Sequence, residues 1–339
     1  MNIRELENSI DEFESTILKL EISGKNISFP IINAIRKVCI NQIPIYAFHT
    51  DKINILRNNS VFDNTYMRER LSQLPITKIN ENKLLNFLPL KYYKDVNFND
   101  KNFERHPEDK MNIEYYIKVK NDGPEKLLNV NTNDLQININ NEKINNSDKY
   151  SEKNPILLIQ LRIGEEFECS LKGVLAVGEY NSIFNASSCY YEEIDENKFI
   201  FNIESSGQIS EYNILNKGCE IIIEKLNIIK ENINNQQYKN INMENNSLII
   251  ELLNEDHTCG GPINYLLQNM KEVIYSGITK PNFMEKNLIL KIKTDKTLNP
   301  INAINKAIEE CISLYEEFKN KFIGLYKGEP KSKKNKKIK

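Results

Sequence analysis

The sequence predicts an α+β protein with two α/β halves and a separate, mainly β unit at 52–186. Runs that alternate between apolar and polar residues, as strands do, occur beside helical segments whose apolar residues recur every three or four positions. This combination occurs on both sides of a polar stretch at 231–246. Residues 52–186 differ in composition from both flanks, which indicates a separate unit.

The first half is expected to begin with a strand at 15–23, followed by a helix that Pro30 opens and that runs to about Asn41. Proline suits the first turn of a helix, where its missing N–H is not needed. The apolar face of this helix consists of Ile31, Ile32, Ile35, Val38 and Cys39. Its opposite stripe consists of Asn33, Arg36, Lys37 and Asn41. Pro44 ends the helix, and 46–55 is expected to be a strand.

After residue 186, a strand is expected at 198–204 and a helix at 213–230. The apolar residues of this helix follow steps of four and three: Leu215, Cys219, Ile222, Leu226 and Ile229. Such a narrow apolar stripe is typical of a helix that packs on another helix.

The separate unit at 52–186 is expected to be mainly β. Short strands are predicted at 113–119 and 135–139, and a strand pair at 156–161 and 166–177, joined at Gly164. The middle of the unit, 96–155, is rich in Asn, Asp and Lys, and the acidic residues from Asp95 to Asp100 are interpreted as solvated surface.

Residues 231–246 are nearly all polar and are interpreted as a linker. A flexible chain of about 15 residues spans roughly 20–25 Å on average. A second α/β unit follows, and its last helix begins after Pro300. The apolar residues of that helix again alternate steps of four and three: Ile304, Ile308, Cys311, Tyr315, Phe318, Phe322 and Leu325. A coiled coil also fits this pattern, but its modest length favours one member of a helix bundle.

Composition places the chain among soluble proteins. Of 339 residues, 40% are hydrophobic and 27% charged, and the six Cys favour free buried thiols over disulfides. No apolar run approaches the roughly 18 residues that span a membrane, so we expect no membrane partner. Net charge is −2; residues 327–339 carry seven Lys and one Glu, or +6, which leaves −8 elsewhere. A folded body of that sign is a poor non-specific DNA binder.

The stretch Glu255–Pro262 could suggest a catalytic or metal site, because His257 and Cys259 stand beside two carboxylates. A zinc site needs about four ligands, and a nucleophilic Cys needs an oriented base. The chain has three His and no C-x-x-C pair, so we favour a strand-to-helix turn in which Thr258 caps the helix. In this interpretation Gly260 and Gly261 let backbone approach closely.

The same turn carries a resemblance to a known family. Asp256-His257-Thr258, followed by Gly260, is similar to the "DHTLGN" turn of the small assembly subunits of cellular RNA polymerases: the eleventh subunit of polymerase II and the archaeal L subunit. The resemblance covers roughly 245–326 and includes Tyr275–Gly277 with Lys280-Pro281, and then Leu288–Ile292. Cys259, Gly261 and Pro262 depart from the pattern, where Leu, Asn and usually Leu are expected.

The first 232 residues resemble a partner family: the third-largest subunit of polymerase II, archaeal D and the N-terminal domain of bacterial alpha. Residues 33–37 are similar to the "NALRR" helix of that family, and 59–61 with 68–75 to "NTSVL…AHRLGLIPL". Residues 163–166 resemble the "PGQE" turn, and 199–207 resemble "FIFTVESTG". Each motif alone is short, but all occur in the order of the family.

The resemblance implies a division of the chain. A third-subunit-like dimerisation domain is expected at 14–51 plus 187–232, with an insert domain at 52–186. An eleventh-subunit-like dimerisation domain is expected at 247–326, and a basic disordered tail at 327–339. In the family, two such domains pair about a pseudo-twofold axis through a four-helix core.

The resemblance also implies which residues make contacts. The dimerisation residues would be Ile32, Ile35, Leu215, Ile222, Leu226, Ile304, Ile308, Tyr315, Phe318 and Phe322. The residues that dock other subunits would be Asn33, Arg36, Lys37, Arg68 and Arg70. The implied partners are the largest and second-largest polymerase subunits and small assembly subunits, with DNA contacted only through the complex. Many members of the resembled family bind zinc or an iron–sulfur cluster through clustered Cys in the insert. This insert contains only Cys169, and Cys189 lies just beyond it. We therefore expect no metal and no cofactor.

The function implied is a noncatalytic assembly platform of DNA-directed RNA polymerase. A single chain that fuses the two partners is characteristic of large cytoplasmic DNA viruses, which implies a viral factory and virion, while the Lys-rich tail also fits a nuclear signal. Two alternatives stay open: a hydrolase or transferase that uses Cys259 and His257, and a nucleic-acid-binding accessory protein that acts through the tail. The sequence contains no triad, P-loop or paired-carboxylate metal motif, which favours the noncatalytic function.

Overall fold

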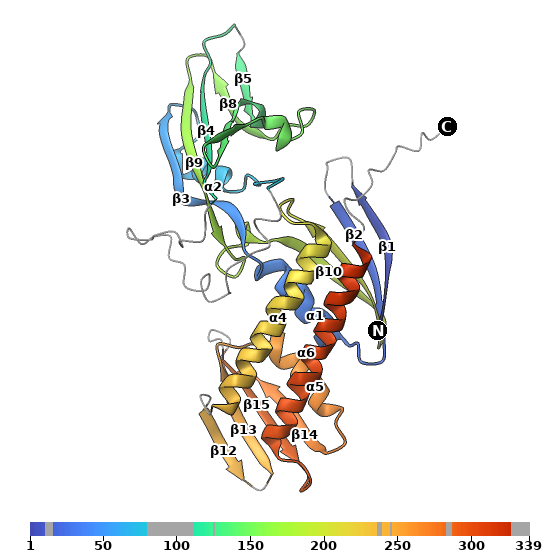
Figure 1. The fold of residues 1–339 in the computed structure, drawn as a ribbon. Helices are drawn as coiled ribbons and strands as arrows, with labels where there is room; N and C mark the ends of the chain where they lie inside the picture. Colours follow the sequence, from blue (N-terminus) through green and yellow to red (C-terminus); the bar gives the residue numbers. More distant parts are fainter. Residues whose placement is uncertain are drawn as a thin grey trace, which may run out of the picture.

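The computed structural model describes residues 1–10, 16–79, 111–124, 126–235, 239–244, 246–282 and 287–326 (Figure 1). The expected basic tail at 327–339 and the acidic residues from Asp95 to Asp100 lie outside these ranges. The described chain is a mixed α+β molecule, which confirms the predicted fold class. None of its helices is long and apolar enough to cross a bilayer.

The sheet of the first half combines two distant parts of the chain. Its four antiparallel strands lie in the order β1-β2-β11-β10. They are β1 (Asn2–Ile10), β2 (Thr16–Ser23), β11 (Lys198–Ser205) and β10 (Ser187–Asp195). In the central pair, Leu20 of β2 lies opposite Phe201 of β11. Strand β1 was not expected, because only Ile3 and Ser9 of its nine residues are buried and the sequence therefore lacks clear alternation.

Two helices cover this sheet. Helix α1 (Phe29–Asn41) has Pro30 in its first turn and buries the predicted apolar face. Helix α4 (Glu211–Asn234) begins two residues before the predicted 213–230 and extends four residues beyond it. The extension has a physical reason, since Ile233 continues the apolar spacing after Ile229 and is itself buried.

The inserted unit contains a five-stranded sheet, β3-β9-β4-β6-β7, and a two-stranded one, β5-β8. Its strands are β3 (Ile45–Asn58), β4 (Ile113–Lys120), β5 (Leu127–Asn131), β6 (Gln136–Ile139), β7 (Glu142–Ile144), β8 (Leu157–Arg162) and β9 (Glu166–Ala176). The helices in its described part are α2 (Asn64–Ser72) and the 3₁₀ turns η2 (Thr132–Asp134), η3 (Asn146–Asp148) and η4 (Ser182–Phe184). Strand β3 runs across the expected boundary at residue 52 and connects the first half to the insert, although its pairing with β9 is irregular between Phe48 and Ile53.

One predicted strand pairing in the insert is wrong. The segments near 156–161 and 166–177 are strands β8 and β9, but β8 pairs with β5, and β9 lies between β3 and β4. The turn at Gly164 has a φ of +82° and carries the chain from one sheet to the other. Asn121 holds this turn, because its carbonyl accepts from Gly164 N at 2.8 Å and its N–H donates to Glu165 O at 2.9 Å.

The second half repeats the plan of the first. Its sheet has the order β12-β13-β15-β14 and is accompanied by α5 (His257–Gln268) and α6 (Pro300–Leu325). The strands are β12 (Lys239–Glu244), β13 (Ser247–Leu253), β14 (Val273–Thr279) and β15 (Asn287–Thr294).

The prediction of a linker at 231–246 is corrected by the structure, because most of this segment is helix or strand. Helix α4 continues to Asn234, and β12 occupies 239–244 and pairs with β13. Ile241 and Met243 alternate with polar residues, a period-two signal that the Asn-rich composition obscured. The part of 231–246 outside regular structure is therefore much shorter than a 15-residue tether.

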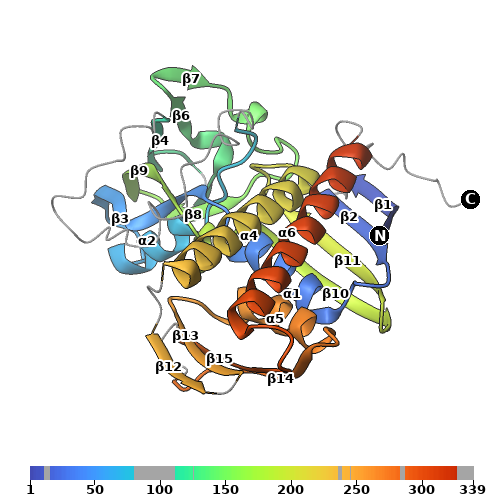
Figure 2. The ribbon, with the colours of Figure 1, turned by 60° about the horizontal axis from the view of Figure 1, so that its bottom comes forward.

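Helices α1, α4, α5 and α6 lie together between the two four-stranded sheets. Figure 2 shows α4 and α6 side by side, with α1 and α5 behind them and the insert beyond one end of the layer. Buried apolar residues of both halves and of the insert form one continuous hydrophobic cluster. The helix layer is therefore a shared core.

Candidate functional site: the helix layer between the two halves

The outer seam of the layer is formed by α4 and α6. Four side-chain contacts follow it: Tyr212 with Tyr326, Glu220 with Lys319, Lys230 with Glu309, and Asn234 with Asn305. Residue numbers rise along α4 as those of the partners fall along α6. The two helices are therefore antiparallel and in contact over their full length.

The buried side of the seam contains all ten residues expected to mediate dimerisation. Ile32, Ile35, Leu215, Ile222, Leu226, Ile304, Ile308, Tyr315, Phe318 and Phe322 are each at most 1% exposed and belong to one cluster. Full burial of such a side chain contributes about 1.5–3 kcal/mol. The Tyr315 hydroxyl also donates to the carbonyl of Ile31 at 3.4 Å, which links α6 to α1.

A glycine sets the distance between α1 and α4. A Cβ placed on Gly218 would lie 2.8 Å from the sulfur of Cys39, closer than real contacts allow. The Cys39 thiol approaches the carbonyl of Ile214 at 3.7 Å. This close crossing was not foreseen, although a glycine in the middle of an otherwise strong helix is a recognisable signal.

The turn before α5 differs from the prediction at its cap. Asp256, and not Thr258, is the N-cap residue, and its carboxylate accepts from Thr258 N at 2.7 Å. Burial alone would raise the pKa of Asp256, but hydrogen bonds from Thr258 and the amines of Lys37 and Lys225 outweigh burial and lower it. Lys37 Nζ lies 4.0 Å from Asp256 Oδ2, so an ion pair joins α1 of the first half to α5 of the second.

The two glycines of that turn have different environments. A Cβ on Gly260 would lie 2.0 Å from Leu288 Cδ2 on β15, so any larger residue here would force the buried Leu288 side chain to move. A Cβ on Gly261 would meet the ring of Pro30 at an ordinary 3.5 Å. The glycine with the closer neighbour, Gly260, is thus the one that agrees with the "DHTLGN" turn.

The possible Cys/His nucleophile has no structural support. His257 is exposed, whereas Cys259 is fully buried. Burial raises the pKa of the Cys259 thiol well above its usual value, and a catalytic cysteine needs an accessible thiolate. Among the described residues, no three His, Cys, Asp or Glu side chains lie close enough to hold a metal ion.

The predicted docking residues of α1 and α2 make contacts within the chain. Asn33 Oδ1 accepts from Arg36 Nε at 3.1 Å and Nη2 at 2.9 Å, which holds the guanidinium along α1. Arg68 Nε donates to the carbonyl of Ile53 at 3.3 Å. Arg70 donates to the carbonyls of Leu158 at 2.8 Å and Leu157 at 2.9 Å, so it fastens α2 to β8.

Two family-like motifs of the insert meet through Asn59. Its side-chain oxygen accepts from Glu166 N at 2.5 Å, its amide nitrogen donates to Gly164 O at 3.4 Å, and its backbone N–H donates to Glu166 O at 3.3 Å. Beside this junction, Val61 and Ile163 are 63% and 61% exposed. Phe62 and Tyr66 stack with ring centroids 4.8 Å apart. We call Val61, Phe62, Tyr66 and Ile163 the insert patch.

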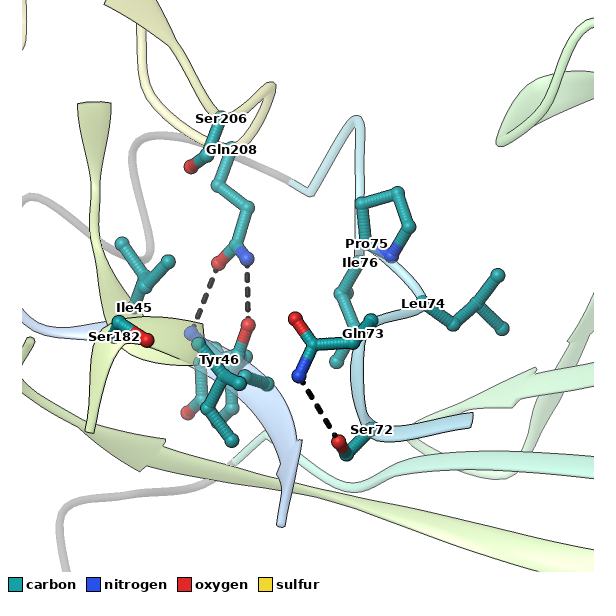
Figure 3. A pocket seen from close by; sticks show the side chains of 12 residues that line it. Ile45, Tyr46, Ser72, Gln73, Leu74, Pro75, Ile76, Ser182, Ser206 and Gln208 are labelled. Carbon is teal, nitrogen blue, oxygen red and sulfur yellow. Dashed lines mark hydrogen bonds between the residues drawn. The ribbon is translucent and has the colours of Figure 1, made fainter. Parts of the chain in front are cut away.

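A cavity of about 170 Å³ lies where the first half meets the insert (Figure 3). The amide of Gln208 holds the backbone of Tyr46 there; its Oε1 accepts from Tyr46 N at 3.0 Å and its Nε2 donates to Tyr46 O at 2.6 Å. Its described lining includes the hydroxyl-bearing residues Tyr46, Ser72, Ser182 and Ser206, but no carboxylate, imidazole, amine or thiol. A serine nucleophile needs an adjacent general base, and none of the described lining residues is an Asp, Glu, His or Lys.

Comparison with protein families decides which class of protein has this layer. Residues 21–226 match the RNA polymerase Rpb3/Rpb11 dimerisation domain, and residues 247–321 match it again. The chain belongs to the RNA polymerase Rpb3/Rpb11 family. Both predictions, that of the family and that of two such domains in one chain, are confirmed. The four helices described above are α1 and α4 of the first Rpb3/Rpb11 match and α5 and α6 of the second.

Individual relatives of this Rpb3/Rpb11-type subunit agree with the two matches. It is 27% identical over 323 residues to a protein of Acanthamoeba polyphaga mimivirus named as a DNA-directed RNA polymerase subunit, and the alignment covers 88% of each chain. The archaeal subunit Rpo11 of Metallosphaera sedula is 40% identical over 75 residues, which are 22% of this chain and 83% of Rpo11. The polymerase II subunit rpb11 of Dictyostelium discoideum is 32% identical over 79 residues, which are 23% of this chain and 65% of rpb11.

Proposed function

We propose that this Rpb3/Rpb11-type subunit is a noncatalytic assembly platform of a multisubunit DNA-directed RNA polymerase. Its two halves act as an intramolecular heterodimer, and the composite surface docks the two largest subunits and small assembly subunits. The single observation that carries the proposal is the antiparallel packing of α4 on α6, because each helix comes from a different Rpb3/Rpb11 match.

Joining the halves in one chain favours their pairing. A short connection holds two partners at an effective concentration on the order of millimolar. Here, only 235–238 separate α4 from β12. The proposed domains are 14–51 plus 187–232, the insert at 52–186, and 247–326, with β3 continuous across the first boundary.

The insert patch is the part of the surface that best fits a docking role. Val61, Phe62, Tyr66 and Ile163 expose apolar area next to the junction that Asn59 holds in place. Exposed apolar side chains gathered in one region often mark protein interaction sites. Arg36 on α1 is the second element, because Lys37, Arg68 and Arg70 each have a partner elsewhere in the chain.

The mimivirus relative supports a viral setting for the proposal. A polymerase subunit of such a virus would act in a cytoplasmic viral factory and enter the virion, and DNA would be contacted through the complex. Affinity purification of the tagged chain from its source cells tests the function. Recovery of two very large polymerase subunits is expected; recovery of the chain without any polymerase subunit would contradict the proposal.

Arg36→Ala gives a sharper version of the same experiment. The isolated variant should keep its melting temperature, because Arg36 contacts Asn33 within one turn of α1. Loss of the second-largest subunit from the purified complex would support docking at this helix. The matched control is Arg4→Ala, an exposed arginine of β1. Wild-type recovery by Arg36→Ala would show that this residue was assigned wrongly.

A further inference from the structure

We propose that Lys225 makes the pairing of the two halves selective for unlike halves, because most of the carboxylates around its buried ammonium group come from the second half. This inference rests on the proposed intramolecular heterodimer. In addition, it identifies the side chains that prevent one half from pairing with a second copy of the same half.

Lys225 lies on α4 and is only 8% exposed, and Glu255, just before α5, is 7% exposed. Burial favours the neutral amine, but Cys259, Glu255, Glu179 and Asp256 outweigh burial and raise the pKa of Lys225. Cys259 stays a thiol at neutral pH, so the carboxylates supply the negative charge. Two of the three carboxylates, Glu255 and Asp256, belong to the second half.

Lys37 adds a second positive charge, which acts on Asp256 together with that of Lys225. Its amine is 4.0 Å from Asp256, with both side chains 37% exposed. The helices of the first half therefore present two lysines here, from α1 and α4, and the second half presents two carboxylates at the start of α5. These charges are complementary across the halves.

The repeated plan of the two halves identifies the positions that correspond. Helices α1 and α5 follow the N-caps Ser28 and Asp256, and α4 and α6 follow the N-caps Ser210 and Asn299. Counted from these caps, Glu255 and Asp256 of the second half correspond to Ile27 and Ser28 of the first half. Lys37 of the first half corresponds to Tyr265 of the second, and Lys225 corresponds to Leu314.

The outer seam supports this correspondence and shows that it cannot select partners. Glu220 and Glu309 each stand ten residues after their caps, and Lys230 and Lys319 each stand twenty residues after them. The Glu220–Lys319 and Lys230–Glu309 ion pairs are thus equivalent under the pseudo-twofold relation. Two copies of α4, or two copies of α6, would form the same pair of bridges.

Selection therefore falls to the charged group formed by Lys225, Lys37, Glu255 and Asp256. In a pair of first halves, Lys225 and Lys37 would face Ile27 and Ser28, and a buried ammonium group would lack a carboxylate from the other half. In a pair of second halves, Glu255 and Asp256 would face Leu314 and Tyr265. Poorly paired buried charges disfavour a complex strongly, so only the unlike pair satisfies both sets of charges.

The test uses the full chain with a protease site inserted between Asn235 and Lys239, cut after purification, unfolded and refolded. Native mass spectrometry then counts mixed pairs and like pairs of fragments. Wild type should give mixed pairs. Lys225→Met with Glu255→Gln should raise the fraction of like pairs about tenfold or more, which corresponds to about 1.4 kcal/mol of lost selectivity. Lys230→Met, at a more exposed lysine of the same helix, is the matched control and should keep mixed pairs.

Mixed pairs alone in the Lys225→Met/Glu255→Gln chain would overturn the inference. A second pair of variants exchanges the charges, in case the first variant fails to refold. Lys225→Glu alone should lose mixed pairs, and the addition of Glu255→Lys should restore them. No recovery would also overturn it. If the wild-type fragments fail to associate at all, the heterodimer proposal itself is wrong, so the two failures are distinguishable.

Discussion

The Lys319 amine lies 2.7 Å from the Glu220 carboxylate, across the seam that joins α6 to α4. Lys217, one turn earlier on α4, approaches the same carboxylate at 3.1 Å. Each of these side chains is partly exposed. The seam therefore combines a partly solvated ionic edge with the fully buried row that contains Phe318.

The two sides of the seam should differ in their contribution to stability. Lys319→Ala should lower the free energy of unfolding by less than about 1 kcal/mol, because a partly exposed ion pair is screened by water. Phe318→Ala should lower it by about 3–5 kcal/mol, because it leaves a cavity in the shared core. Urea denaturation of both variants checks this. Similar losses for the two would mean that the seam is not packed as described.

Stability should fall in acid in a way that depends on Glu220. Burial raises the pKa of Glu220, but hydrogen bonds and charges from Lys319 and Lys217 outweigh burial and lower it from its usual 4.5. A carboxyl group with a lowered pKa in the folded state contributes stability that is present above pH 4.5 and is lost as pH falls further. Denaturation curves between about pH 3 and 7 should show a shallower acid loss in Glu220→Gln than in wild type. Equal slopes would contradict this assignment.

The turn before α5 offers a matched pair of substitutions. Gly260→Ala should destabilise the chain by about 1–3 kcal/mol, because the new methyl group overlaps Leu288. Gly261→Ala should have a smaller effect, since its methyl group would meet Pro30 at ordinary contact distance. Thermal melting of both variants distinguishes them. A larger drop in melting temperature for Gly261→Ala than for Gly260→Ala would show that the start of α5 is misplaced.

The insert patch should matter for assembly and not for folding. Val61→Ser with Phe62→Ser should leave the melting temperature of the isolated chain nearly unchanged, because both side chains are exposed. The same variant should recover less of the large polymerase subunits in affinity purification, since apolar contact area is lost. Ile323→Ser, an exposed apolar residue of α6, serves as the control. Full recovery by the patch variant would place docking elsewhere.

Strong periodicity explains which parts of the fold could be predicted. The apolar residues around Ile222 on α4 and around Phe318 on α6 repeat at helical spacing, so their buried faces follow from sequence alone. Strands β1 and β12 were missed because their sequences are mostly polar and they lie at the sheet edges.

Long-range relationships could not be predicted in the same way. The turn at Gly164 looks like a hairpin locally, but the pairing of β8 with β5 depends on residues about 30 positions away, such as Asn129 opposite Gln160. Lys225 looks like a solvated helix residue in the sequence, but it is buried, and its proposed role depends on the position of Glu255 in the other half. Such cross-domain partners appear only once the two halves are packed.

Cutting the chain between Asn235 and Lys239 under native conditions tests the central claim most directly. The account predicts that both fragments elute together in size-exclusion chromatography, at the volume of the uncut chain, because α4 and α6 bury large apolar side chains against each other. The uncut chain that carries the same inserted site is the control. Separate elution of two folded fragments would contradict the account.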